Sequence, residues 1–110
     1  MKRIRSYSRV TTEALSLFGK LIKTTRLERG QTSEEVADRA GISRTTLRNI
    51  ENGSAGTEIG AAFEVAALLG IRLFDPDPSS LALHTARLDE KLTLLPKAVR
   101  APTAEIDDDF

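Results

Sequence analysis

The sequence predicts an all-α protein: a compact five-helix domain with one short possible strand and flexible termini. Apolar residues recur at intervals of three and four in five segments, which is the period of a helix with one buried face. Glycine stands just after each of the first four segments, where helices commonly end. These two observations fix the number of helices and their approximate limits.

Residues 32–53 predict two short helices joined by a sharp turn. Thr32 and Glu35 have the spacing of a capping box, in which each side chain accepts a hydrogen bond from a backbone N–H. Gly41 ends the first helix in left-handed backbone, which glycine adopts without strain. Ser43 is a good N-cap for the second helix. The expected buried positions of the pair are Val36, Ala37, Ala40, Leu47 and Ile50.

The second of these helices has a polar outer face without acidic residues. Its members are Arg44, Thr45, Thr46, Arg48 and Asn49. Taken alone, such a face could be an ordinary solvated surface. On the exposed helix of a helix-turn-helix we expect this face, together with Ser43 at the start of the helix, to contact DNA, because Arg can pair with guanine and Asn with adenine through two hydrogen bonds each.

Three further helices are expected at 12–29, 58–69 and 81–95, with Thr57 as the N-cap of the second. The segment 71–74 alternates weakly and is a possible short strand, which four residues are too few to decide. The first helix is expected to bury Leu15, Phe18, Ile22 and Thr25, with Ala14 and Leu21 beside them. The second is expected to bury Ile59, Ala62, Phe63, Val65, Ala66 and Leu69.

Over about residues 12–70 the chain resembles the lambda-repressor-like, Cro/Xre-type helix-turn-helix family. The motifs that carry the resemblance are Arg26-Leu-Glu-Arg-Gly, Gln-Thr-Ser-Glu-Glu-Val-Ala, Ala-Gly-Ile-Ser and Ile-Glu-Asn-Gly. The resemblance implies that Arg26 and Glu51 form a partly buried ion pair. It also implies that Ser33 contacts a phosphate, together with base-reading roles for Arg44, Thr45 and Asn49. The family often has Gln where this chain has Ser33 and Arg44, so the preferred bases are not carried over.

Charge is distributed unevenly, although the net charge of the 110 residues is zero. Residues 1–53 hold 11 Lys and Arg against 6 Asp and Glu, whereas residues 54–110 hold 5 against 10. A basic half beside an acidic half indicates a DNA-facing surface and a separate protein-facing or solvated one.

The domain plan expected from composition is a basic arm at 1–10, a DNA-binding and dimerisation domain at 11–95, and a flexible acidic tail at 96–110. The basic residues Lys2, Arg3, Arg5 and Arg9 either grip DNA or form a solvated terminus. The chain has no cysteine, and no apolar run approaches the roughly 20 residues that span a bilayer. The basic start lacks the apolar core of a secretory signal. We therefore expect a cytoplasmic protein without contact to a membrane.

An excess of apolar residues in the C-terminal half indicates self-association. Leu81, Leu88, Leu92 and Leu95 align on one helix face, and they are either core or a dimer interface. A dimer is favoured because one recognition helix reads few base pairs, whereas a two-fold dimer matches a palindromic operator on double-stranded DNA. The expected interface comprises Ile71, Leu73, Phe74, Leu88 and Leu92.

No pattern in the sequence indicates catalysis. It contains no nucleophile–base pair, phosphate-binding glycine loop or carboxylate dyad, and His84 has no second metal ligand nearby. We expect neither an enzyme nor a cofactor.

Three short segments, 63–77, 95–100 and the closing Asp107-Asp-Asp-Phe, are similar to HipB-like antitoxins. The resemblance implies a homodimer that represses its own operon and binds a HipA-type Ser/Thr kinase toxin through its acidic half. Three alternatives stay open. The acidic tail could only improve solubility, the chain could mainly restrain a toxin with DNA binding secondary, or it could be a stand-alone regulator with a small-molecule effector.

Overall fold

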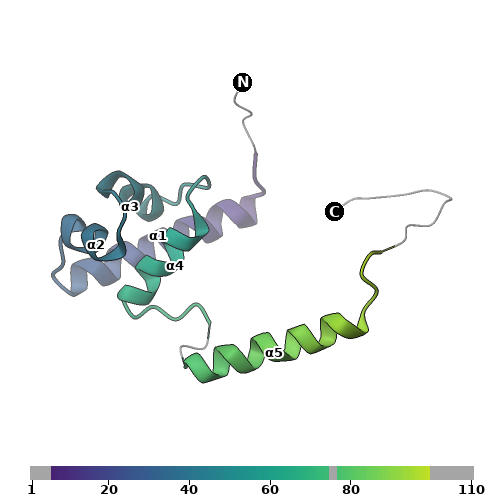
Figure 1. The fold of residues 1–110 in the computed structure, drawn as a ribbon. Helices are drawn as coiled ribbons and strands as arrows, with labels where there is room; N and C mark the ends of the chain where they lie inside the picture. The colour runs from purple at the N-terminus through teal and green to yellow at the C-terminus, as the bar shows by residue number, and fades with distance from the viewer. Residues whose placement is uncertain (1–5, 75–76, 100–110) are drawn as a thin grey trace. The chain divides into compact units, whose positions relative to one another are not determined.

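The computed structural model describes residues 6–74 and 77–99, apart from the side chain of Pro78. Five helices follow one another in this part of the chain: α1 (Arg9–Glu28), α2 (Ser33–Ala40), α3 (Arg44–Glu51), α4 (Ile59–Leu68) and α5 (Pro78–Leu94) (Figure 1). The predicted all-α class is confirmed. Of the expected arm at 1–10 and the expected tail at 96–110, residues 1–5 and 100–110 lie outside the described residues.

The chain divides into two compact units, residues 1–73 and 74–110. The first contains α1 to α4 and the second contains α5. The expected single domain of residues 11–95 therefore spans both units, and each is described here by itself.

The short strand predicted at residues 71–74 is wrong, because no described residue is in a strand. After Gly70, which has a φ of 76°, the backbone N–H of Ile71 donates to the carbonyl of Ala66 at 2.8 Å. The segment that alternates in the sequence is thus used in part to close the end of α4, and it has no neighbouring strand to pair with.

Helix α1 begins three residues before the expected Thr12. Ser8 is its N-cap, and the Ser8 hydroxyl accepts a hydrogen bond from the backbone N–H of Thr11 at 3.3 Å. Arg9, which was expected in the arm, is helical and forms an exposed ion pair with Glu13 at 3.0 Å. Helix α5 also begins earlier than expected, because Asp77 caps it at the backbone N–H of Ser79.

The predicted helix-turn-helix is confirmed in its local detail. Thr32 accepts from the N–H of Glu35 at 3.0 Å, and the Glu35 carboxylate accepts from the N–H of Thr32 at 2.8 Å, which completes the capping box. Gly41 ends α2 with a φ of 72°. Ser43 caps α3 by accepting from the N–H of Thr46 at 3.0 Å.

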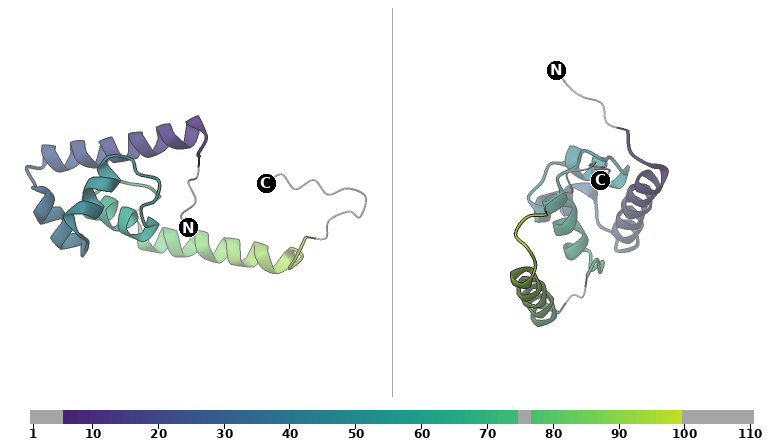
Figure 2. Two further views of the ribbon diagram at one scale, coloured as in Figure 1. Left: turned by 90° about the horizontal axis from the view of Figure 1, so that it is seen from above. Right: turned by 90° about the vertical axis from the view of Figure 1, so that its right-hand side faces the viewer.

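The core of the first unit is formed where α2, α3 and α4 meet the inner face of α1 (Figure 2). Its buried apolar residues are Ile22, Val36, Ala37, Leu47, Ile50, Ala61, Val65, Ala66 and Leu69. The large residues come from every helix of the unit, so no single helix pair could exclude water by itself.

The inner face of α4 was only partly predicted. Ile59 and Phe63 were expected in the core but are 70% and 44% exposed, and Ala61 is buried instead. The N-cap is Glu58 rather than Thr57, whose hydroxyl donates to the carbonyl of Ser54 at 3.2 Å. Ile59 and Phe63, four residues apart on one face of α4, border an apolar hollow of about 350 Å³, which Leu15, Phe18 and Leu73 also line.

Helix α1 approaches the end of α3 more closely than any side chain would allow. A Cβ atom at Gly19 would lie 2.5 Å from the carbonyl oxygens of both Ile50 and Glu51. At Gly53, where φ is 78°, a Cβ atom would lie 3.0 Å from the Cα atom of Ser16. Two glycines therefore permit backbone-to-backbone packing at this point.

We expect Gly19→Ala to lower the free energy of unfolding by roughly 1–3 kcal/mol, because the added methyl group meets backbone that cannot move aside cheaply. Urea denaturation followed by circular dichroism measures this. Gly60→Ala is the matched control: nothing lies within 4 Å of its Cβ position, and alanine there should raise the free energy of unfolding by roughly 0.5–1 kcal/mol. Equal effects of the two substitutions would contradict the close approach.

Candidate nucleic-acid interface

Helix α3 has one buried side and one open side. Leu47 and Ile50 anchor it in the core, with exposed fractions of 0% and 3%. The opposite side is exposed and consists of Arg44, Thr45, Arg48 and Asn49. Because residues four apart share a helix face, Thr45 lies beside Asn49 and Arg44 beside Arg48. This surface offers two guanidinium groups, an amide and a hydroxyl, with no carboxylate among them.

Ser43 and Thr46 lie at the start of this surface and use their hydroxyls within the fold. The Ser43 hydroxyl caps the helix and also donates to the Thr46 hydroxyl at 3.0 Å. Thr46 is only half-exposed. Their first role is therefore to fix the first turn of α3, which orients the neighbouring Arg44 and Thr45.

The structure brings Arg26 of α1 and Glu51 of α3 into direct contact. The guanidinium donates twice to the carboxylate, from Nε to Oε2 at 2.8 Å and from Nη2 to Oε1 at 3.2 Å. Its Nη1 donates to the backbone carbonyl of Gln31 at 3.1 Å. The Arg26 and Glu51 side chains are only 9% and 7% exposed. One side chain thus joins α1, the turn before α2 and the last residue of α3.

The electrostatics of this pair keep Arg26 charged. Its hydrogen bonds to Glu51 raise the pKa of Arg26 above the ordinary value, while burial acts in the opposite direction and the charge of Glu51 adds to the increase. The pair links the helix that holds the core to the helix that carries the open polar surface.

Ser33 is the first residue of α2 and is half-buried. Backbone N–H groups at a helix start attract anions, so this position suits a phosphate contact. The first turn also carries Glu34 and Glu35, and Glu35 is held in the capping box. The basic residues Lys2, Arg3 and Arg5 of the expected arm lie outside the described residues.

The five residues expected in a dimer interface differ in their surroundings. Ile71 is half-buried and packs against the core of the first unit. Leu73 and Phe74 are 40% and 67% exposed. Leu88 and Leu92, in α5, are 61% and 64% exposed.

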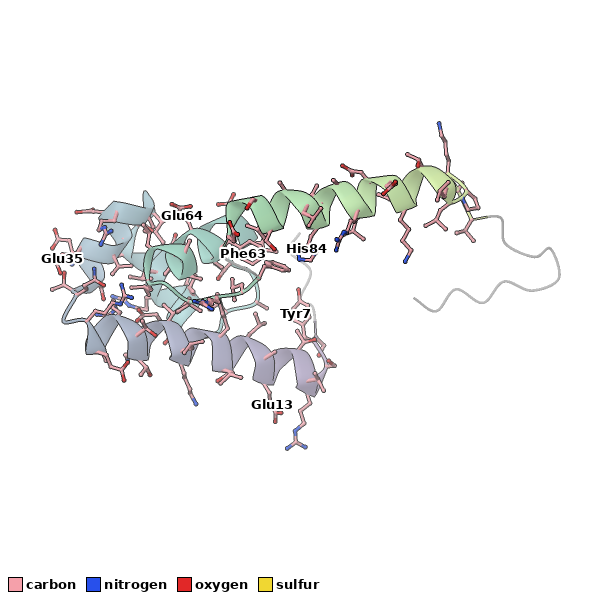
Figure 3. All side chains as sticks on the ribbon, turned by 90° about the horizontal axis from the view of Figure 1, so that it is seen from below. Tyr7, Glu13, Glu35, Phe63, Glu64 and His84 are labelled. Atoms are coloured by element: carbon pink, nitrogen blue, oxygen red, sulfur yellow. The ribbon has the colours of Figure 1, made fainter. Side chains whose placement is uncertain are left out.

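No group of three metal-ligating side chains gathers anywhere in residues 6–74 and 77–99. His84 lies on α5 and is exposed (Figure 3). Within the described part of the chain no helix is both long and apolar enough to cross a membrane.

Two short helices at a sharp turn, with the second anchored by its apolar side and open on its polar side, define a helix-turn-helix of the kind that enters a DNA groove. Residues 22–75 match a family model described as helix-turn-helix. The match supports a lambda-repressor-like, Cro/C1-type domain and, with it, a DNA-binding transcription regulator.

A solved structure titled "MDT Protein" is similar to this chain, with 24% sequence identity and a TM-score of 0.49, over 67% of this chain and 93% of that one. No match was found among the curated proteins.

The main feature missed by sequence reasoning is Gly19. A glycine inside an amphipathic helix costs helical stability, so its presence between Phe18 and Ile22 signals a close backbone contact. Sequence reasoning also missed the exposure of Leu21. This residue was expected beside the core stripe, but its side chain is 45% exposed.

We expect Glu51→Ala to lower the free energy of unfolding by roughly 3–5 kcal/mol, because it leaves the buried guanidinium of Arg26 without its carboxylate. The double variant Arg26→Met/Glu51→Leu removes both charges and should be more stable than Glu51→Ala. Urea denaturation compares the two. If the double variant is no more stable, an unpaired buried charge is not the cause of the loss.

Proposed function

We propose that this protein is a sequence-specific transcriptional repressor that reads a palindromic operator with α3. The observation that carries the proposal is the open side of α3, where Arg44, Thr45, Arg48 and Asn49 are exposed while Leu47 and Ile50 hold the helix in the core. Arginine can donate twice to a guanine edge and asparagine can pair with an adenine edge. Ser33 and the start of α2 are proposed to contact a phosphate.

The repressor acts as a homodimer in this proposal. Leu81, Leu88 and Leu95 recur at intervals of seven along α5 and its C-cap, and all are exposed. This spacing is typical of a helix that pairs with another helix. The proposed dimer surface comprises Leu73, Phe74, Leu88 and Leu92, which are exposed, and Ile71, which is half-buried, and a dimer doubles the number of base pairs read.

We expect Arg44→Ala and Asn49→Ala each to weaken operator binding by roughly 1–3 kcal/mol, because each removes a bidentate contact to a base edge. Fluorescence anisotropy with DNA from upstream of the chain's own reading frame measures the loss. Arg87→Ala is the control, since it removes the same charge from α5 rather than α3. Unchanged affinity of both α3 variants would remove α3 from the DNA contact.

A narrower proposal is that the protein is the antitoxin of a HipA-type kinase, with the acidic half as the toxin-binding surface. Its support is the similarity of segments 63–77 and 95–100 to HipB-like antitoxins and the excess of 10 acidic over 5 basic residues in 54–110. The same acidic half also fits a module that mainly restrains a toxin, in which case DNA binding is secondary.

If the antitoxin proposal holds, a kinase-like reading frame adjoins this one, and its tagged product captures the full chain on co-expression. A chain ending at Leu95 should be captured less well, because it loses the acidic tail, while its operator affinity stays at the full-length value. A neighbouring frame without kinase features, or equal capture of both chains, would count against the acidic tail as partner surface.

A further inference from the structure

Helix α1 carries a second apolar stripe that the core does not use. Val10, Ala14, Leu17 and Leu21 follow one another at intervals of four, three and four, so they share one face. The middle of this stripe lies about 110° around the helix from Ile22, which is buried at 0% exposure, so the stripe borders the core face of α1. Val10 is 76% exposed, Leu17 70% and Leu21 45%. Three large apolar side chains in line on a solvent-facing helix are more than scattered surface residues.

Helix α1 is at the outer edge of the first unit. Viewed from above, α1 runs along one edge of that unit, and α2, α3 and α4 all lie to one side of it (Figure 2). Glu13, next to the stripe, projects away from the rest of the unit (Figure 3). The first unit therefore covers the inner face of α1 and leaves the outer face open.

We propose that the outer face of α1 is a self-association surface that pairs with α1 of a second copy in antiparallel orientation. Intervals of four, three and four are those of the a and d positions of a helix pair that packs knobs into holes. With Val10 opposite Leu21 of the second copy, Ala14 falls opposite Leu17, and the two-fold axis repeats both pairs. The small Ala14 leaves room for the larger leucine at each central layer.

Charge complementarity determines the orientation. In this register the flanking positions place Glu13 opposite Lys20 of the second copy, and symmetry forms the same pair a second time. Both residues are exposed, and neither is drawn into the core. In a parallel pair the flanking position opposite Glu13 is Phe18 and that opposite Lys20 is Thr25, so no ion pair forms. The antiparallel arrangement alone uses both charges.

Antiparallel pairing through α1 is also compatible with operator binding by α3. This point rests on the proposed function. Helix α3 lies on the upper side of the first unit in Figure 1, whereas α1 runs along one edge of that unit in Figure 2. A two-fold axis that passes beside α1 and perpendicular to it leaves both α3 helices on the same side of the pair. The surface shares no residue with the one proposed around α5, so the two can act together, joining copies on adjacent operator sites.

The test is the oligomeric state of the full chain without DNA, measured by sedimentation velocity over a range of concentrations. Leu17→Arg should abolish the association through α1. It is measured both alone and together with Leu88→Glu, so that pairing through α5 does not mask the loss. Both residues are exposed, and circular dichroism checks that each variant keeps its helical content.

Charge exchange tests the register. Glu13→Lys and Lys20→Glu should each raise the dissociation constant roughly threefold to thirtyfold, because each places like charges together at two symmetric positions. The double variant restores both pairs and should return to the wild-type constant. The ion pair of Arg9 with Glu13 is lost in Glu13→Lys and in the double variant but kept in Lys20→Glu, so recovery is judged by comparing the double variant with Glu13→Lys. Lys23→Glu, the same charge change away from the stripe, should have no effect.

Failure of the double variant to recover, or equal association of Leu17→Arg and wild type in both backgrounds, overturns the proposal. Because the assay contains no DNA, failure of α3 to bind an operator leaves its result unchanged. The two proposals can therefore fail separately.

Discussion

The fold of the first unit depends on the contact between α1 and the C-terminal end of α3. Gly19 lets the two backbones meet, and the Arg26–Glu51 pair joins the same two helices one to two turns further along α1. At one point the two helices pack backbone to backbone, and at the next a buried ion pair joins them. These two contacts leave α3 little freedom to rotate or slide against α1. Its polar side is consequently held at a fixed angle to the rest of the unit, which a base-reading surface requires.

Local chemistry explains why the helix-turn-helix could be predicted almost residue by residue. The Thr32–Glu35 box, Gly41 and the Ser43 cap each act within one turn of the backbone, so their spacing in the sequence is sufficient evidence for them. The family resemblance supplied the pairing of Arg26 with Glu51, which are 25 positions apart and which no local rule connects. The roles of the α3 side chains toward DNA stay predictions.

The errors fall where an element depends on packing rather than on its own sequence. In α4, Ile59 and Phe63 have the period of a buried face, yet Ala61 is in the core and the two larger residues border the apolar hollow, because the packing of α4 against its neighbours decides which face is buried. The weakly alternating residues after Gly70 predict a strand, but a strand needs a partner, which single-segment periodicity cannot reveal. Helix α1 has an apolar residue on nearly every side, so periodicity alone does not separate its core stripe from its outer one.

The presence of two apolar stripes on α1 bears on how the protein works. A helix that served only the core would be expected to present polar residues on its outer side, as α3 does. Helix α1 instead combines Val10, Leu17 and Leu21 with Glu13 and Lys20 at flanking positions, a composition that resembles one strand of a helix pair more than a solvated surface. The same helix contacts α3 through Gly19 and Arg26. Any partner on the outer face of α1 is therefore connected by one rigid element to the side chains proposed to read DNA. Association and operator binding would then be coupled through α1 itself, without a separate linker to transmit the effect.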